Sequence, residues 1–373
     1  MEQSNVYRIR PKFDYVLFFS IWALVLIGIL MVYSSSYPIG IKEKNNGTYF
    51  FMRHLVFILI GTIAMFIAMV FPLKILRKYS GFIWLMTVGL CVIPFLSSPI
   101  ENTYRWINVF NKFTLQPSDL LKVSAALHFP TILSKKRRSD VERLVFSLGF
   151  IGFNVGLVYL QRDLSTALVI AAALFVMYFA TTMKLGEAFV YAMAVPVGVF
   201  YIANRGFRSN RIKAFLDPFS DSLNVGWHTI QGMYAVANGG LWGVGIGNSI
   251  QKYFYVYAAY SDYAFAIVVE ELGFVRAALI LLCYIFISFK FITYGFKMMD
   301  TFTSTFLVAV GTYIGFQSLV HMGVVVNAIP STGITLPFIS YGGTSILAYF
   351  TMVGISFNIL NHCPRRELKW YIL

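Results

Sequence analysis

The sequence predicts an all-α integral membrane protein, a bundle of about ten transmembrane helices. Hydrophobic residues make up 58% of the 373-residue chain and charged residues only 12%, and the mean hydropathy is +0.70. A soluble fold of this length cannot bury that much apolar surface, and so few charges would leave it poorly solvated. Both difficulties disappear if lipid is the surrounding solvent.

Ten apolar segments have roughly the length that a helix needs to cross a hydrocarbon core about 30 Å thick. Alternation at period two is absent and the segments are too long for barrel strands, so we expect helices. The fourth segment is short and begins with polar residues. The predicted spans are 14–36, 50–71, 80–97, 118–134, 144–161, 164–182, 186–203, 263–291, 302–325 and 344–361.

Basic residues predict the orientation. Lys and Arg are concentrated in alternate short loops, such as 135–138 and 365–366, and the positive-inside rule places these loops and both termini in the cytoplasm. Segment 204–262 is then a long extracellular loop between helices 7 and 8, and a loop of this length is usually functional. The formal net charge of +14 follows from topology and contact with membrane lipids, so we expect no nucleic-acid binding.

The cysteine and histidine patterns predict neither a disulfide nor a metal site. Cys91, Cys283 and Cys363 contain no pair in an outer loop, so we expect no structural disulfide. The five histidines have no metal-ligand spacing, and no other ligand cluster indicates a metal or cofactor.

Charged residues in or beside a membrane span are costly, so each is a candidate functional residue. Asp119 and Lys122 lie three residues apart at the start of the fourth span, where they share a helix face. They are either a neutralised pair that holds this helix in the bundle, or Lys122 also faces an anionic substrate. Arg105, beside Trp106, either binds a phosphate or anchors the chain at the membrane interface.

A second candidate, Asp163, lies in QRDLSTA (161–167), between two spans that nearly touch. It either caps the next helix or has a functional role, and the sequence does not separate the two. Gln161 precedes it.

A third candidate region is a group of four basic residues in the long loop. Arg groups bind pyrophosphate through paired hydrogen bonds, whereas the alternative is attraction to lipid headgroups. The glycines of 239–247 resemble a nucleotide-binding loop only superficially, because no strand precedes them. The four residues are Arg205, Arg208, Arg211 and Lys213.

The fourth region is the start of the eighth span. Asp262 opens it, and Glu270 and Glu271 follow two turns deeper. Around a helix, Glu270 lies roughly 80° and Glu271 roughly 180° from Asp262, so we expect the two glutamates to have different roles. At least one needs a partner in the bundle, and Arg276 and Lys122 are the candidates.

Five motifs, in order along almost the whole chain, resemble the signatures of the SEDS family, which includes FtsW, RodA and SpoVE. GNSIQK and LPFISYGG are most similar to the division (FtsW) and sporulation (SpoVE) branches. The motifs are QRDLSTA (161–167), IKAFLDPF (212–219), GGLWGVGIGNSIQK (239–252), the segment 262–274, and TGITLPFISYGGTS (332–345).

The resemblance implies a single transmembrane domain over 1–373 that polymerises lipid II at the outer face of the bacterial plasma membrane. It also implies a peptidoglycan glycosyltransferase that works with a class B penicillin-binding protein, a transpeptidase with one membrane helix, and with other division or elongation proteins. The family's essential loop aspartate corresponds to Asp262. The supporting residues implied by the other motifs are Asp119, Trp106, Gln161, Asp163, Glu270, Glu271, Ser340, Gly342 and Gly343.

The sequence departs from the family pattern at 257–260, where YAAY replaces the common Pro-Glu and a following His or Gln. The acid of the fourth helix is Asp119 rather than the usual Glu. Asp262 itself is retained.

Lipid II chemistry agrees with these residues. Its sugar is carried on a pyrophosphate, a leaving group that needs no protonation, so one carboxylate is enough to activate the attacking hydroxyl. We expect Asp262 to be this base. Basic residues then stabilise the pyrophosphate, and the candidates are Arg105, Lys122 and the group at 205–213. A divalent cation is compatible with this chemistry, although no cofactor is evident.

Two other classes of protein also place charges in such a bundle. A lipid II flippase or another transporter would have inverted repeats and helices interrupted at the bilayer midplane, whereas these charges lie toward the outer edge. A non-catalytic scaffold of the division machinery needs binding surfaces but no carboxylate at a substrate site.

Overall fold

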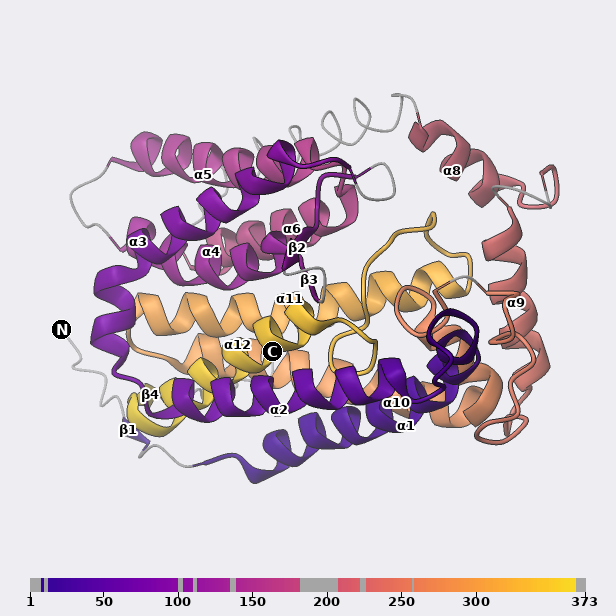
Figure 1. Cartoon of the computed structure of the whole chain (residues 1–373). Coiled ribbons are helices and arrows are strands. Elements are labelled where there is room, and N and C mark those ends of the chain that lie inside the picture. Colours follow the sequence, from indigo (N-terminus) through magenta and orange to yellow (C-terminus); the bar gives the residue numbers. More distant parts are fainter. Residues whose placement is uncertain are drawn as a thin grey trace, which may run out of the picture.

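The computed structural model describes residues 8–9, 13–99, 103–109, 113–134, 139–181, 207–221, 226–256 and 258–366, without the side chains of 8–9, 181, 207–210, 213 and 365–366. Long helices run roughly side by side through most of the molecule (Figure 1). The elements are β1 (Arg8–Ile9), α1 (Tyr15–Lys44), α2 (Tyr49–Val70), α3 (Leu73–Val92), η1 (Ile93–Leu96), β2 (Ile107–Val109), β3 (Phe113–Leu115), α4 (Pro117–Leu133), α5 (Asp140–Leu160), α6 (Leu164–Thr181), α8 (Phe207–Leu216), α9 (Trp227–Gly239), α10 (Ala264–Lys297), α11 (Thr301–Val325), α12 (Gly343–His362) and β4 (Arg365–Arg366).

The helices have the lengths and composition of membrane spans. Among the described residues, seven are long and apolar enough to cross a bilayer: α1, α2, α3 with η1, α5, α10, α11 and α12. A shorter apolar helix covers Leu164–Ala180. The chain is therefore a multi-pass helical membrane protein, as predicted. The predicted span 186–203 lies outside the described residues, so a count of about ten stays a prediction.

Several helices extend beyond the predicted spans. The first predicted span ends at 36, but α1 continues through Pro38 to Lys44. The third predicted span begins at 80, whereas α3 begins at Leu73 and includes three exposed basic residues in its first turns. Hydropathy detects only the part of a helix that crosses hydrocarbon, while helical hydrogen bonding continues into the polar interface. The predictions were therefore too short at these ends.

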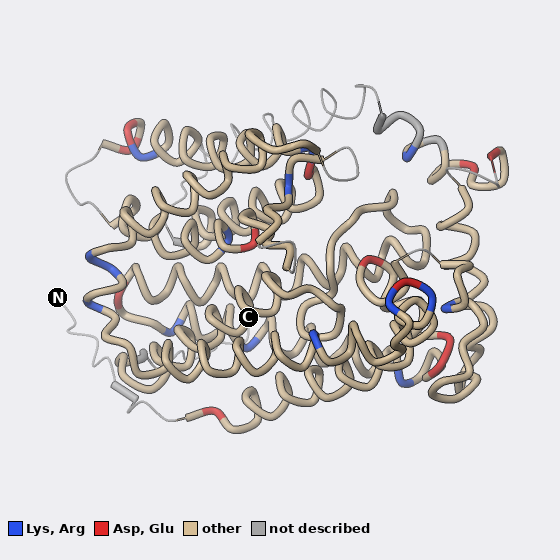
Figure 2. The backbone as a smooth tube through the Cα atoms, viewed as in Figure 1, with Lys and Arg blue, Asp and Glu red and all other residues tan. Residues whose placement is uncertain are grey.

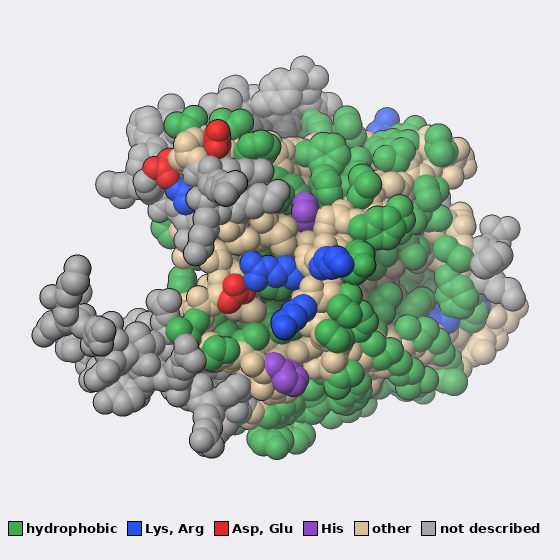
Figure 3. Space-filling model, turned by 90° about the vertical axis from the view of Figure 1, so that its left-hand side faces the viewer, with side chains coloured by type: hydrophobic (Ala, Val, Ile, Leu, Met, Phe, Trp, Pro, Cys, Tyr) green, Lys and Arg blue, Asp and Glu red, His purple; other side chains and the backbone are tan. Residues whose placement is uncertain are grey.

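Most charged residues lie toward the two ends of the bundle (Figure 2). Figure 3 looks at the end where α2 joins α3 and shows a group of Lys and Arg there, with hydrophobic side chains on the flanks. Arg77 at this end pairs with Asp300 at 3.2 Å. The β1 strand pairs antiparallel with β4, so the segments near the two termini lie together, as a common side of the membrane requires.

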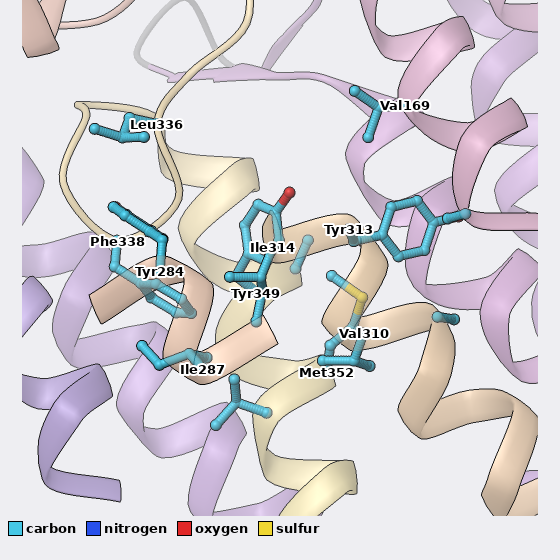
Figure 4. Close-up of a cluster of buried hydrophobic side chains, with 14 of the residues drawn as sticks. Val169, Tyr284, Ile287, Val310, Tyr313, Ile314, Leu336, Phe338, Tyr349 and Met352 are labelled. Atoms are coloured by element: carbon cyan, nitrogen blue, oxygen red, sulfur yellow. The ribbon is translucent and has the colours of Figure 1, made fainter. Parts of the chain in front are cut away.

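The core lies between α10, α11 and α12. In α11 and α12, 67% and 83% of the apolar stretch is buried, against 22% in α3 and α5, which makes the first two the central helices. Figure 4 shows Tyr284, Tyr313 and Tyr349 packed among aliphatic side chains of this core. The Tyr284 hydroxyl donates to the carbonyl of Pro337. This bond ties the segment between α11 and α12 to α10.

Candidate active site

A cavity of about 300 Å³ opens near the end of the bundle where α1 joins α2. Its walls come from α1, α2, the β2–β3 hairpin, α4, the turn before α10 and the segment between α11 and α12. The structure brings together seven residues that the sequence singled out, from four separate parts of the chain. They are Arg105, Trp106, Asp119, Lys122, Asp262, Gly342 and Gly343.

Asp262 is positioned by a tight turn before α10. The backbone N–H groups of Ser261 and Tyr263 donate to the carbonyl of Ala258, at 3.0 and 3.4 Å. Ala258 has a φ of 52°, in the left-handed region that residues with a Cβ rarely occupy. This turn closes directly beneath the aspartate and fixes where its backbone enters the helix.

The segment between α11 and α12 holds this turn in place. The Ser340 hydroxyl donates to the carbonyl of Ser261 at 2.7 Å and accepts from the N–H of Leu336 at 2.9 Å. The N–H of Tyr341 donates to the carbonyl of Tyr260 at 2.9 Å. Ser340 therefore has a structural contact that explains a supporting role.

Asp262 and Arg105 meet at Gly333. The Arg105 guanidinium donates to the Gly333 carbonyl over 3.5 Å. A Cβ on Gly333 would lie 3.2 Å from Arg105 Nη1 and 3.3 Å from Asp262 Oδ2, so both groups approach this glycine closely and would have to shift slightly for a larger residue. Arg211 donates to the carbonyl of Ser331 at 3.3 Å, two residues away. Segment 331–333 therefore binds two arginines and lies beside the Asp262 carboxylate.

The pKa of Tyr263 also responds to the charges around Asp262. Burial is the main reason that the pKa of its hydroxyl is raised, to about 12; the charge of Asp262 acts in the same direction, and that of Arg211 acts to lower it. Both charges therefore lie near the same phenol. Arg211 belongs to the charged surroundings of Asp262, although it comes from α8, far from the other site residues in the sequence.

The predicted ion pair at the start of α4 is present. Lys122 Nζ lies 2.8 Å from Asp119 Oδ1, and both side chains are buried. Lys122 also donates to Gln317 Oε1 at 3.0 Å, and the Tyr349 hydroxyl donates to the same oxygen at 2.6 Å. The pair therefore joins α4 to α11 and α12 and also lines the cavity, so the two interpretations of the sequence are compatible.

Several polar residues of the cavity, among them Arg53 and Gln317, escaped the sequence analysis. Arg53 of α2 lines the cavity, and its guanidinium lies 4.9 Å from the centre of the Phe113 ring. Gln317 was overlooked because it lies within the apolar α11. The rule that flags polar residues in membrane spans applies to Gln317 as it does to charges, and it would have found this residue.

Asp163 and Gln161 lie behind the cavity. Asp163 Oδ1 accepts from the N–H of Thr166 at 3.1 Å, so the predicted helix cap is present at the start of α6. Its other oxygen accepts from the side-chain amide of Gln116 at 2.9 Å, and Gln116 itself lines the cavity. Gln161 donates to the carbonyl of Cys91 at 2.6 Å. These contacts fasten the α5–α6 junction to α4 and α3.

The remaining basic residues are only partly covered. Arg205 lies outside the described residues, and Arg208 and Lys213 belong to α8 with side chains that are not described. Within the described part of the chain, no group of three or more His, Cys, Asp or Glu side chains is arranged to hold a metal ion.

Glu270 and Glu271 have other partners than we expected. Glu271 pairs with Lys252 at 3.0 Å and accepts from the Ser34 hydroxyl at 2.6 Å. Arg276 instead donates to backbone carbonyls, and Lys122 binds Asp119 and Gln317.

Both glutamates bind the same segment, 247–252, through different groups, and different roles for them stay a prediction. The helical-wheel argument ignored a chain segment that wraps around α10. Such a segment reaches both faces of the helix, so an angle of about 100° between neighbouring residues does not separate their partners.

A bundle of membrane-spanning helices with a charged cavity near one end defines the class of this protein. The chain matches the model of the FtsW, RodA and SpoVE family, described as "Cell cycle protein", over residues 15–364. It belongs to this family. The expected resemblance is confirmed.

Similarity to individual relatives supports this family assignment. The chain is 33% identical over 361 residues to the probable peptidoglycan glycosyltransferase FtsW of Trichlorobacter lovleyi, with 93% of each chain covered. It is 33% identical over 344 residues to stage V sporulation protein E of Bacillus subtilis, covering 90% of this chain and 93% of the relative.

Solved structures share the fold. A chain from a study of "structural coordination of polymerization and crosslinking by a peptidoglycan synthase complex" superposes with a TM-score of 0.76 at 23% identity, over 93% of this chain and 97% of the other. The rod shape determining protein RodA of Thermus thermophilus superposes with a TM-score of 0.68 at 20% identity, over 93% and 96%.

Proposed function

We propose that this protein is a peptidoglycan glycosyltransferase that polymerises lipid II at the outer face of the bacterial plasma membrane, with both termini in the cytoplasm. The observation that carries the proposal is the meeting of the Asp262 carboxylate and the Arg105 guanidinium at Gly333, in an open cavity. A base and an anion-binding group side by side are what transfer of a sugar from a pyrophosphate requires. Membership of the family supports the substrate class.

In the proposed reaction, the 4-hydroxyl oxygen of the acceptor sugar attacks the anomeric carbon of the donor. Its proton passes to Asp262, and the bond between the anomeric carbon and the pyrophosphate oxygen breaks with inversion. Undecaprenyl pyrophosphate leaves as an anion. Because that anion needs no proton, a second carboxyl group acting as an acid is unnecessary.

The cations of the site differ in how much charge they offer the leaving group. Lys122 is already paired with Asp119 at 2.8 Å, so its charge is largely neutralised locally. Arg105 and Arg211 donate to the carbonyls of Gly333 and Ser331, on the short segment that Asp262 also approaches, so both are placed to hydrogen-bond a phosphate there. We therefore assign the leaving pyrophosphate to Arg105 and Arg211, and keep Arg205, Arg208 and Lys213 as further candidates. A divalent cation carried by the pyrophosphate is compatible with this step.

We also propose a role in septal or related cell-wall synthesis, together with a class B penicillin-binding protein. Identity to FtsW and to a sporulation protein over nine tenths of the chain supports the cell-cycle role. The structural neighbour from a complex described by polymerization and crosslinking supports pairing with a transpeptidase.

The test is lipid II polymerisation by Asp262→Asn protein reconstituted in vesicles. Asn keeps the size of Asp but accepts no proton, so we expect glycan synthesis to fall by about 10²–10⁴-fold with unchanged thermal stability. Asp217→Asn is the matched control, because Asp217 is an exposed carboxylate that accepts from the N–H groups of its own neighbours, Phe219 and Ser220. It should retain full activity.

Near-normal synthesis by well-folded Asp262→Asn protein would contradict the mechanism. If that protein also moved fluorescent lipid II across the vesicle membrane, the transporter interpretation would replace it.

A further inference from the structure

Residues 240–252, called here the glycine lobe, exchange hydrogen bonds with the kink in α10. Gly273 has a φ of 81° and interrupts the helix. An unbroken helix would bond the N–H groups of 274 and 275 to the carbonyls of 270 and 271. Instead those N–H groups donate to Gly240 and Leu241, at 2.9 and 3.2 Å, and those carbonyls accept from 244 and 245, at 2.9 and 3.1 Å. Two helical bonds are replaced by four bonds to the lobe.

The second half of the lobe is satisfied by buried side chains. Glu270 accepts from the N–H groups of Ile250 and Gln251 at 3.2 and 3.3 Å. Glu271 accepts from Lys252 at 3.0 Å, and Lys252 also donates to the carbonyl of Gly247 at 2.5 Å. Irregular backbone at membrane depth is tolerated only where such groups are paired within the protein. The two glutamates and the lysine supply that pairing.

The outer surface of the lobe is apolar. Leu241, Trp242, Ile246 and Ile250 are 62%, 66%, 58% and 60% exposed. This surface continues onto α10, where Phe274 is 60% exposed. Contiguous exposed apolar residues of this kind mark a surface that meets something other than water.

The lobe contacts α1 below the level at which that helix becomes polar. No charged residue occurs in α1 from Tyr15 to Ile41, and Lys42 is the first. Lys42 lies 4.3 Å from the ring of Phe254, just after the lobe. Lys252 donates to Ser34 at 2.9 Å, and Ser34 is eight residues before Lys42, or about 12 Å along the helix. The lobe therefore reaches into the depth range of the apolar span.

We propose that the glycine lobe is a re-entrant segment seated in the outer leaflet, with Leu241, Trp242 and Ile246 in contact with lipid acyl chains. Acyl chains are the occupant because the lobe surface is continuous with the exposed apolar side of α10, a membrane span. The proposal is independent of the proposed catalytic activity. The assignment to the outer leaflet depends on the orientation predicted from the basic residues.

Nitroxide spin labels in vesicles test the depth. The background replaces Cys91, Cys283 and Cys363 with Ala, and labels are attached through Trp242→Cys or Ile246→Cys. Collisions with oxygen, which partitions into lipid, should exceed those with a water-soluble nickel chelate by several-fold at both positions. Phe254→Cys is the matched control at the level of Lys42, and its label should show the reverse ratio.

Nickel collisions at 242 and 246 equal to those at 254 would place the lobe in water and overturn the proposal. Protection from both reagents would mean that protein covers the lobe, which also contradicts acyl-chain contact. A measurement without the cysteine changes uses native Trp242: lipids brominated in the acyl chain should quench the fluorescence that Trp242→Phe removes. Equal quenching of both proteins would likewise contradict the proposal.

Discussion

Two clusters of charge near the start of α10 look alike in sequence but differ in where their hydrogen bonds go. In the cavity, Lys122 pairs with Asp119 at 2.8 Å, close to Asp262. Two turns along α10, Lys252 pairs with Glu271 at 3.0 Å. Both lysine side chains are almost fully buried, 2% and 4% exposed. Distance and burial therefore do not distinguish a substrate site from a structural one.

The difference lies in what surrounds each pair. The glutamates bind backbone and side-chain groups of the glycine lobe, so their partners belong to the chain itself. Asp262 and Arg105 instead face an open cavity of about 300 Å³. A charge in a membrane helix indicates a function only when part of its bonding capacity is directed to a space that a substrate can enter.

The largest effect on stability is expected at the Lys252–Glu271 ion pair. Lys252→Met leaves the Glu271 carboxylate buried without its cation, so we expect the free energy of unfolding to fall by about 3–5 kcal/mol. Thermal unfolding in detergent measures it. The double variant Lys252→Met with Glu271→Gln removes both charges and should recover much of the loss. An equal loss in the single and double variants would mean that an unpaired Glu271 charge is not the cause of the destabilisation.

An intermediate effect is expected in the cavity, on rate rather than stability. Arg105→Gln removes a cation whose contact with Gly333 is long, at 3.5 Å, so unfolding should change little. Polymerisation should slow by about 10²–10³-fold, as when one group that stabilises a developing anion is lost. Steady-state rates with purified lipid II measure it. Arg276→Gln, on the lobe side of α10, is the control, and equal slowing in both variants would remove Arg105 from the site.

The smallest effect is expected at the opposite end of α10, where Lys290 pairs with Asp14 at 3.3 Å. Burial alone would raise the pKa of the Asp14 carboxyl, but hydrogen bonds from Tyr294 and Leu17 and the charge of Lys290 hold it below 3.8. A lowered folded-state pKa stabilises the fold above the unfolded pKa, and this stabilisation is lost as the pH falls through the folded value. For a partly exposed pair we expect about 1 kcal/mol or less.

Comparison with Asp14→Asn checks this, since Asn keeps the helix cap and loses the charge. The difference in unfolding temperature between the two proteins should be constant from pH 7 to about 5 and should shrink below about pH 4. A difference that does not depend on pH would show that the charge of Asp14 contributes nothing.

Much of the architecture follows from contiguous residues alone. The helix at 302–325 in the prediction is Thr301–Val325 in the structure, because a bilayer thickness and a helical rise together set the length of an apolar segment. The Asp119–Lys122 pair was also predictable, since residues three apart on a helix are neighbours whatever the rest of the fold does.

Only the tertiary structure decided which charges meet. Arg105 contacts Gly333 across 228 positions of sequence, and Ser34 contacts Glu271 across 237. No periodic pattern in the sequence predicts such pairs, because they depend on how whole helices pack. The same holds for Glu270 and Glu271: their spacing along α10 was known, but their partners came from a segment that folds back on the kink at Gly273. Local spacing determines which face a side chain occupies, and packing determines what that face meets.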